Sequence, residues 1–447
     1  MAELTAHEQL LLELVNRARL DPAGEAARYG IALNQGLSPG TLAGGSRDPL
    51  APNDLLNDAA LGHTSWMLAS DVFSHTGAGG SSPTQRMTAA GYALSGAWTT
   101  GENIAWVGTT GSIDLEQFTL AIHRNLFLSA GHRTNILSEA FREVGIGIDT
   151  GVFTDGSDWN AAMATENFAR SGTGYFLTGV VYGDDDGDAF YDIGEGQGGV
   201  GVAVSGGAGD TTGAAGGYAI AFAGGTVDVT FSGGGLAGAV AVTVAAGAHN
   251  AKVDYIGGGE ILSSASATLG SGAEHLTLLG TRDIDGAGNA AANTIRGTVG
   301  ANVLSGLGGA DTLIGNAGAD RLDGGTGSDL LRGGAGADRL LGGADADVFD
   351  FNAVSETRRG GARDSIGDFE RGSDHIDLSG IDARSGGADN ALRWIGKNDF
   401  HGRAGELHYV KKAGYVLVEG DVNGDGRADF QIKIDGLGAI GKGDFIL

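Results

Sequence analysis

Aspartates return every nine residues in one glycine-rich stretch of the sequence, at Asp311, Asp320, Asp329, Asp338 and Asp347. Glycines shortly before each aspartate allow turn conformations that other residues avoid, and such turns leave main-chain carbonyls exposed. Carboxylates and peptide carbonyls are the oxygen ligands that calcium prefers, and calcium accepts about six to eight of them. The spacing therefore predicts a series of calcium sites along this stretch.

The aspartates belong to nine-residue units that run from Gly288 to Asp350. Position six holds Asn293 and Asn302 in the first two units and aspartate in the other five. Position eight is always apolar, at Ile295, Leu304, Leu313, Leu322, Leu331, Leu340 and Phe349. One inward side chain per unit indicates a very short strand, which is buried only when many copies stack. The two asparagine units are expected to form a weak starting cap.

If two units make one coil, position six of alternate units must align. Asp311, Asp329 and Asp347 would then share one edge, and Asp320 and Asp338 the other. Carboxylates held a few ångströms apart repel each other unless a cation lies between them. Residues 288–350 resemble the β-roll of RTX proteins, a calcium-binding parallel repeat found in secreted bacterial proteins. The resemblance implies Ca²⁺ as the cofactor and Asp311, Asp320, Asp329, Asp338 and Asp347 as ligands.

A second acidic cluster lies in the stretch DDDGDAFYDIGE. If Asp184 is counted as position 1, acidic residues occupy positions 1, 3, 5, 9 and 12, which are Asp184, Asp186, Asp188, Asp192 and Glu195. This is the spacing of a calcium loop, but position six is Ala189 and helices do not flank it. The loop resembles that of the B-type repeats of bacterial surface proteins (SdrD B-like), which are calcium-stabilised β-sandwiches. The later turn DVNGDGRAD offers Asp421, Asn423, Asp425 and Asp429 as further candidate ligands.

Three phrases near the amino terminus contain candidate catalytic or zinc-binding residues: DVFSHTGAGG, TGENIAW and SAGHRTNILSEAFREVGIGI. They resemble the bacterial branch of the CAP superfamily (cysteine-rich secretory, antigen 5 and pathogenesis-related proteins). The resemblance implies an α/β/α sandwich with a cleft that contains His75, Glu102 and His132. Two imidazoles and a carboxylate can hold Zn²⁺ and leave a position open for water. Serine at position 129, where the family has a second glutamate, weakens the case for catalysis.

Composition changes along the chain predict a multidomain α+β protein. Helices after Thr5, after Asn53 and from Leu115 to about Gly131, with strands at 143–149 and 159–170, suit a domain over residues 1–172. Short alternating runs between glycines suit a small acidic β-sandwich over 174–256. Residues 257–287 are expected as a linker, 288–350 as the β-roll and 351–447 as a β-rich carboxy-terminal module.

Residues 351–447 resemble the secretion module of serralysin-type proteases through the phrases DVFDFNAVSET, DSIGDFERGSDHIDLSGIDA and EGDVNGDGRADFQIKI. The resemblance implies export by a type I machine that recognises the carboxy terminus. The last four residues, Asp444 to Leu447, have the acidic-then-apolar pattern of its signal element and could equally form a final buried strand.

The charge balance excludes some partners. With 55 acidic and 28 basic residues, the formal charge of −27 disfavours nucleic acid and favours cations. The sequence contains no cysteine, and therefore neither disulfides nor thiolate metal sites. No apolar run reaches the roughly 18 residues of a transmembrane segment. The amino terminus lacks the features of a cleaved signal peptide.

The sequence thus favours a secreted calcium-binding protein that displays a CAP domain and folds on calcium binding after export. That domain is interpreted as a binding module for an unknown extracellular ligand. Two alternatives stay open: a secreted metal-dependent hydrolase or peptidase that uses His75, Glu102 and His132, and a structural component of a cell surface or biofilm.

Overall fold

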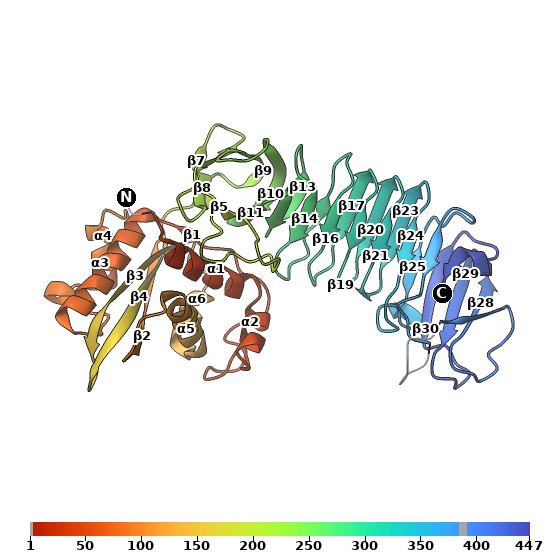
Figure 1. Cartoon of the computed structure of the whole chain (residues 1–447), viewed down its shortest axis with the longest axis horizontal. Helices are drawn as coiled ribbons and strands as arrows, with labels where there is room; N and C mark the ends of the chain where they lie inside the picture. The colour runs from red at the N-terminus through yellow and green to blue at the C-terminus, as the bar shows by residue number, and fades with distance from the viewer. Residues whose placement is uncertain (1–2, 384–390) are drawn as a thin grey trace. The chain divides into compact units, whose positions relative to one another are not determined.

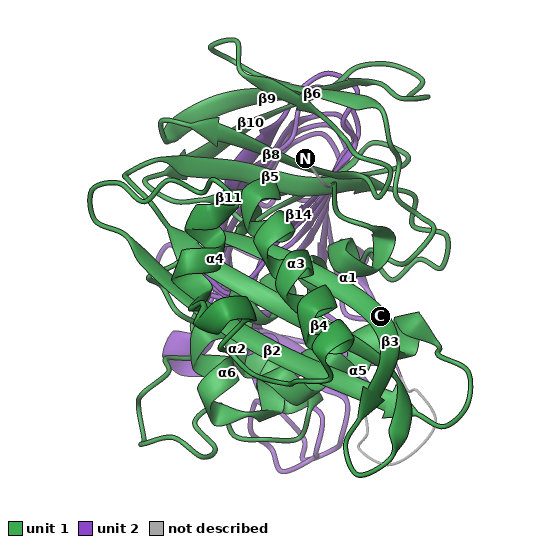
Figure 2. Cartoon of the chain, turned by 90° about the vertical axis from the view of Figure 1, so that its left-hand side faces the viewer, with its two compact units in different colours: residues 1–264 green, residues 265–447 purple. Residues whose placement is uncertain are grey.

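The computed structural model describes residues 3–383 and 391–447, and the chain forms two compact units that divide after Ser264 (Figures 1 and 2). The first unit contains all the α-helices of the described residues, and the second is built almost entirely of strands. No helix in the described part of the chain combines the length and the apolar character needed to cross a bilayer.

The first unit begins with a four-stranded sheet in the order β1-β3-β4-β2. Its strands are β1 (Ala51–Pro52), β2 (Thr99–Thr109), β3 (Glu143–Thr154) and β4 (Asp158–Arg170). Strand β4 pairs antiparallel with both β2 and β3, as the alternating apolar pattern predicted for β3 and β4. Alternate residues of β4 face opposite cores: Ala162, Ala164 and Phe168 on one side, and Ala161 and Met163 on the other.

Helices cover both faces of this sheet (Figure 2). Helices α1 (Ala6–Leu20) and α5 (Leu115–Leu128) pack on one face, and α3 (Asp54–Ser70) packs on the other. The predicted capping box of Thr5 and Glu8 starts α1, and Asn53 caps α3. Gly145 and Gly147 allow α3 to lie directly on β3, because a Cβ at either position would come within about 2 Å of the helix backbone.

Four shorter helices complete this part: α2 (Pro22–Arg28), η1 (Ala78–Gly80), α4 (Pro83–Ala89) and α6 (Ala130–Ile136). The helix expected to run from Leu115 to about Gly131 ends instead at Leu128. The chain is extended at Ser129, and α6 then begins at Ala130. Because of this break, His132 lies on α6 and not on α5.

The rest of the first unit is two sheets. One contains β10 (Val240–Gly247), β9 (Gly225–Gly233), β6 (Val200–Val204) and β7 (Gly209–Thr211) in that order, and the other contains β12 (Glu260–Ser263), β11 (Ala251–Ile256), β5 (Tyr175–Tyr182) and β8 (Gly217–Phe222). Stacked rings of Phe231 and Tyr255 join the two sheets across their core. Lys252 of β11 reaches back to α1, where it pairs with Glu13 over 2.8 Å.

The second unit is a pair of parallel strand stacks (Figure 1). One stack contains β13 (Ser266–Leu269), β15 (Gly286–Ala287), β17 (Val303–Gly308), β20 (Arg321–Thr326), β23 (Arg339–Ala344) and β25 (Asp364–Ile366). The other contains β14 (His275–Leu278), β16 (Thr294–Arg296), β18 (Thr312–Ile314), β21 (Leu330–Arg332), β24 (Val348–Asp350) and β26 (His375–Asp377). The short strands β19 (Ala317–Gly318) and β22 (Ala335–Gly336) pair at a turn.

The register confirms that two nine-residue units make one coil, because Leu313 pairs with Leu331 and Leu322 with Leu340. All seven apolar residues at position eight are fully buried. The segment 257–287, expected as a linker, instead contains strands β12, β13, β14 and β15. Its apolar residues Leu262, Leu269 and Leu276 are buried, so parallel stacking begins well before the first glycine-rich unit.

The chain ends in β27 (Arg393–Gly396), β28 (Glu406–Lys412), β29 (Tyr415–Asp421), β30 (Phe430–Asp435) and β31 (Phe445–Ile446), with short 3-10 turns η2 (Gly360–Ala362) and η3 (Lys442–Asp444). Strands β28, β29 and β30 form an antiparallel meander, and β30 pairs parallel with β25. Strand β31 pairs with β26, and its residue Ile446 is 41% exposed. Within the terminal segment Asp444–Leu447, Phe445 and Ile446 thus form a last strand, which was the structural alternative to a signal element.

Candidate calcium sites and the histidine cleft

The five repeat aspartates lie inside the coil with only 1–2% of their surface exposed. Each carboxylate is held by the main chain of the coil before it: the N–H of Asp311 donates to Oδ1 of Asp329 and that of Asp329 to Oδ1 of Asp347, over 2.8 and 2.9 Å. On the other edge, the N–H of Asp320 donates to Asp338 over 2.8 Å. The predicted alignment of alternate units is confirmed.

The second oxygen of every one of these carboxylates is buried without a hydrogen-bond partner. Burial, together with the neighbouring carboxylate in each column, raises the pKa of Asp320 to about 7 and that of Asp329 to about 6. Burial also raises the pKa of Asp347 to about 7 and that of Asp338 to about 6. A buried anionic oxygen without a donor is costly unless a proton or a cation compensates it.

The first two units do not share this feature, because their asparagine side chains are fully used. The main-chain N–H of Asn289 donates to Oδ1 of Asn293 over 2.7 Å, and the amide nitrogen of Asn293 donates to the carbonyl of Glu274. Asn302 makes the equivalent pair of bonds to Thr298 and Ile284. The unpartnered oxygens therefore begin where the sequence changes from asparagine to aspartate.

Backbone conformation at position two separates the same two groups of units. In all five aspartate units position two has a positive φ, at Leu307, Asn316, Gly325, Gly334 and Gly343. Asn289 and Thr298, at position two of the asparagine units, do not have a positive φ. In these five units the second aspartate oxygen has no hydrogen-bond partner. Leu307 adopts this strained conformation without being glycine.

The glycine at position one lies beside the open oxygen. A Cβ added to Gly324 would lie 2.3 Å from Oδ2 of Asp329 and 2.6 Å from the carbonyl oxygen of Gly342. The same two kinds of oxygen crowd Gly306 and Gly315. Carboxylate and peptide oxygens therefore converge beside position one, which is the donor set that suits calcium.

Two further aspartates extend the columns beyond the seven units. The N–H of Asp338 donates to Asp364 over 2.8 Å, and that of Asp347 donates to Asp374 over 3.1 Å. Asp364 is fully buried, its Oδ2 lacks a partner, and burial raises its pKa to about 8. Sequence reasoning missed both, because Asp364 follows Asp338 by 26 residues and Asp374 follows Asp347 by 27. Each lies two positions before a buried isoleucine, just as position six of the repeat lies two positions before position eight. This pattern in the sequence could have identified both aspartates.

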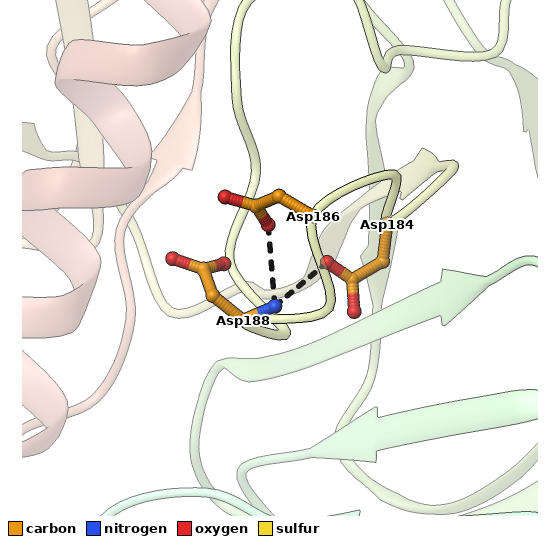
Figure 3. A group of neighbouring side chains, drawn as sticks. All are labelled: Asp184, Asp186 and Asp188. Carbon is orange, nitrogen blue, oxygen red and sulfur yellow. Dashed lines mark hydrogen bonds between the residues drawn. The ribbon is translucent and has the colours of Figure 1, made fainter.

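Three residues of the first acidic loop, Asp184, Asp186 and Asp188, come together (Figure 3). Within residues 3–383 and 391–447, they are the one group of three acidic or histidine side chains whose ligand atoms lie within 4.8 Å of one another. The N–H of Asp188 donates to both other carboxylates, which bends the loop around them. Asp192 and Glu195, the other two predicted ligands, lie outside the group. Glu195 accepts from the N–H groups of Asp185 and Asp192 and so braces the loop.

The later acidic turn is held by its own backbone. Asp421 is fully buried and accepts from the N–H groups of Gly424 and Gly426, while Asp429 accepts from those of Val422 and Asn423. Asn423 and Asp425 likewise accept from main-chain N–H groups. These bonds account for a tight turn between β29 and β30.

His75 and Glu102, two of the three residues predicted to line a cleft, are in direct contact. Nδ1 of His75 lies 2.9 Å from Oε1 of Glu102, and Arg86 of α4 pairs with the other oxygen of Glu102. Burial lowers the pKa of His132 on α6, and the nearby imidazole of His75 lowers it further. Arg86 also donates to the carbonyls of His75 and Ser81, so it fixes the loop that precedes α4. Sequence reasoning did not identify Arg86.

Comparison with known families assigns both ends of the chain. Residues 12–163 match the model of the cysteine-rich secretory protein family, CAP. The chain contains a CAP domain. Residues 233–447 match the model of the peptidase M10 serralysin C terminal, so the chain also contains a serralysin-type carboxy-terminal domain. No curated protein matched the sequence.

Solved structures give weaker similarities. An extracellular protein containing a SCP domain from Bacillus anthracis str. Ames is 21% identical over 38% of this chain and 45% of that one, with a TM-score of 0.25. The AlgE6R3 subunit of the Azotobacter vinelandii mannuronan C5-epimerase is 26% identical over 35% of this chain and 78% of that one (TM-score 0.19). An outer surface protein from Borrelia burgdorferi is 15% identical over 38% of this chain and 97% of that one (TM-score 0.25). This chain covers less than half the length of the first of these.

The geometry of the CAP domain bears on what its cleft could hold. Glu102 is the one carboxylate of the predicted set, and Arg86 already neutralises it. His75 uses Nδ1 to contact the same carboxylate. Ser129 caps α6 without a side-chain hydrogen bond and adds no anionic ligand. The ion pair with Arg86 therefore balances the one negative charge of the predicted set.

Proposed function

We propose that this chain is a secreted protein whose carboxy-terminal repeats bind calcium and fold on binding it after export. The observation that carries the proposal is the row of buried aspartate oxygens without hydrogen-bond partners, at Asp311, Asp320, Asp329, Asp338, Asp347 and Asp364. Peptide carbonyls crowd the same space at Gly306, Gly315 and Gly324. Calcium, when bound there, would supply the positive charge that the coil lacks.

The aspartates have two separable roles in this proposal. Oδ1 joins one coil to the one before it by accepting a hydrogen bond from a main-chain N–H. Oδ2 is left for the cation. Because a buried carboxylate pays a large desolvation cost, the coil is favourable only when that cost is offset. Folding and ion binding are therefore coupled.

This coupling suits export followed by folding. Where free calcium is scarce, an acidic chain with charge −27 repels itself and stays expanded. Extracellular calcium modules bind at about 10⁻⁴ to 10⁻³ M, so the outside medium would fill such sites. The serralysin-type domain supports a type I route, in which the carboxy terminus is recognised.

In the acidic loop, Asp184, Asp186 and Asp188 are proposed as a separate calcium site, because their carboxylates converge and two of them are exposed to the medium. Asp192 and Glu195 would stabilise the loop without contacting the ion.

We further propose that the CAP domain is a binding module rather than a hydrolase. Its support is the ion pair of Glu102 with Arg86, which leaves no free carboxylate among His75, Glu102 and His132.

The coupling is tested by far-ultraviolet circular dichroism of the full chain. Purified protein in excess EGTA is titrated with calcium, and in parallel with magnesium as the control ion. We expect the strand signal to rise cooperatively with calcium and little with magnesium, which keeps its water shell more strongly. A spectrum that is fully β-rich in EGTA and unchanged by calcium would contradict the proposal.

Metal analysis of the same protein, with and without His132→Ala, tests whether the CAP domain is a binding module or a hydrolase. Stoichiometric zinc that is lost in the variant would favour the hydrolase.

A further inference from the structure

One buried carboxyl group of the CAP domain belongs to none of the sites above. Glu166 lies on β4 with none of its surface exposed. Nδ2 of Asn103 donates a hydrogen bond to one of its oxygens over 2.9 Å, and the other oxygen has no partner. A buried carboxylate is stable only when donors or cations compensate its charge. Among the described residues one amide is the only donor to Glu166, so its ionised form is poorly compensated.

The amide that donates to Glu166 also contacts the segment that carries His132. Nδ2 of Asn103, on β2, donates to the main-chain carbonyl of His132 over 3.3 Å as well as to Glu166. Oδ1 of Asn103 accepts from Nδ2 of Asn135 over 2.9 Å. These three contacts fix the orientation of the amide, with its nitrogen toward two acceptors and its oxygen toward a donor. Asn103 therefore joins a titratable group to α6.

Asn135 extends the connection to Glu102. Asn135 and His132 both lie on the short helix α6, and Nδ2 of Asn135 also donates to the main-chain carbonyl of Glu102 over 3.2 Å. Two hydrogen bonds thus tie α6 to β2, one at the carbonyl of His132 and one at the carbonyl of Glu102. Both residues belong to the predicted site of the CAP domain. The position of α6 against β2 therefore sets where their side chains lie relative to each other.

Glu166 changes charge near neutral pH. Burial raises its pKa to about 7, although the hydrogen bond from Asn103 opposes the shift. Glu166 points to the same face of β4 as Ala164 and Phe168, which α1, α5 and α6 cover. In the described part of the chain, the buried ionisable groups of the surrounding elements are engaged with other partners: Glu8, Glu13 and Arg19 on α1, His123 on α5, Arg133 on α6, Glu102 on β2 and Glu143 on β3. The charge of Glu166 therefore acts on its surroundings through Asn103.

We propose that the proton on Glu166 controls the position of α6 against β2, and with it the geometry of the site at Glu102 and His132. When Glu166 loses its proton, the unpartnered oxygen of the buried anion competes for the second N–H of the Asn103 amide, which then releases the carbonyl of His132. While the proton is present, both hydrogen bonds between α6 and β2 hold. Glu166 is thus a positioning residue that acts through Asn103. The consequence for ligand binding rests on the proposed role of the CAP domain as a binding module.

The test follows the two carbonyls directly, by TROSY NMR of the full chain in saturating calcium from about pH 5 to about pH 9, a range that includes the pKa of a buried carboxyl group. The peptide nitrogens of Arg133 and Asn103 share their peptide bonds with the carbonyls of His132 and Glu102, so their ¹⁵N shifts report the hydrogen bonds there. We expect the Arg133 shift to change with an apparent pKa of about 7, and the Asn103 shift to follow it. Shifts that stay constant through this range would overturn the proposal.

Variants assign the transition to Glu166. Glu166→Gln is a neutral group of the same size, so both shifts should keep their acidic values at every pH. His132→Gln removes the imidazole but keeps the carbonyl, and the transition should persist. Asp155→Asn, in the exposed hairpin between β3 and β4, is the matched control and should behave as the wild type does. Thermal unfolding of each variant establishes that it is folded.

A transition that survives in Glu166→Gln, or disappears in His132→Gln, would refute control by Glu166. Because the measurement uses no ligand, it can fail while the binding-module proposal holds, and the metal analysis described above can contradict that proposal while the transition is present. The two failures are therefore distinguishable.

Discussion

The main-chain N–H of Asp311 donates to Oδ1 of Asp329, eighteen residues further along the chain, over 2.8 Å. The other oxygen of Asp329 is buried and has no partner. One carboxylate therefore does two things: it joins consecutive coils, and it places an anionic oxygen beside the glycine carbonyls of the turn. The aspartate units thus differ from the two asparagine units, whose side-chain oxygens accept from a position-two N–H.

Asp329→Asn separates these two roles. The asparagine oxygen can still accept from Asp311, but the anionic ligand is lost. In calcium we expect a lower thermal midpoint and about tenfold weaker binding at the affected coil, because one charged ligand is missing. In EGTA the variant should be as stable as the wild type or more stable, since a buried charge has been removed. Asp323→Asn is the control, because that side chain is 38% exposed and lies outside the columns. A variant that loses equal stability in both media would contradict the separation.

Asp364→Asn tests the extension of the column past the seven units. Asp364 accepts from Asp338 as a repeat aspartate would, and its second oxygen is also buried without a partner. We expect the number of calcium ions bound by the full chain, measured by equilibrium dialysis, to fall by about one. Asp399→Asn, at an exposed position in the same domain, should leave the number unchanged. Identical stoichiometry in wild type and Asp364→Asn would show that the column ends with the repeats.

Glu166→Gln should make the CAP domain more stable at pH 8 but not at pH 5. Glu166 on β4 is fully buried, Asn103 donates to one of its oxygens, and the other has no partner. Burial raises its pKa to about 7, so the folded state retains a proton that the unfolded state releases at about pH 4.5. The contribution of this group to stability is therefore full below about pH 4.5 and is lost as the pH rises through about 7.

A shift of this size corresponds to roughly 3 kcal/mol at pH 8, and glutamine avoids that loss. Chemical unfolding in saturating calcium, followed by tryptophan fluorescence, measures it. Four of the five tryptophans, Trp66, Trp98, Trp106 and Trp159, lie in the first unit. Glu139→Gln, at a side chain that is 75% exposed, is the control and should show no pH-dependent gain. An equal effect of Glu166→Gln at pH 5 and pH 8 would count against a raised pKa.

Lys252→Met should destabilise the whole first unit. Lys252 is buried between Glu13 of α1 and Asp254 of β11, and contacts both carboxylates. Removing the cation leaves two buried anions, which costs about 3–5 kcal/mol in comparable cases. Adding Glu13→Gln to Lys252→Met should recover part of that loss, because one of the anions is then neutral. If the single variant unfolds like the wild type by tryptophan fluorescence, the ion pair does not hold the CAP domain to the following sheets.

How far the sequence predicts this structure differs between its parts. The nine-residue period predicted which side chains are buried and which aspartates align, because positions six and eight recur at a constant spacing and the units stack in one register. The period could not reveal Asp364 and Asp374, since the segment after Asp350 interrupts the spacing. The strands at 257–287 were hidden because they lie outside the nine-residue period: Leu262, Leu269 and Leu276 are buried, but their spacing is not that of position eight.

The cleft was predictable only as a set of residue types. The motifs identified His75, Glu102 and His132, but the contact of Arg86 with Glu102 depends on where α4 packs, and nothing in the local sequence fixes that. The acidic loop shows the same limit. The spacing predicted the same role, that of a calcium ligand, for Asp184, Asp186, Asp188, Asp192 and Glu195. In the structure Glu195 instead accepts hydrogen bonds from two main-chain N–H groups.

The central claim, that cations compensate the buried aspartates of the coil, is tested most directly by anomalous X-ray diffraction. Crystals of the full chain grown in millimolar calcium should show anomalous density within about 2.3–2.6 Å of the second carboxylate oxygens of Asp311, Asp329 and Asp347. Clear density for these three side chains with no ion beside any of them would contradict it.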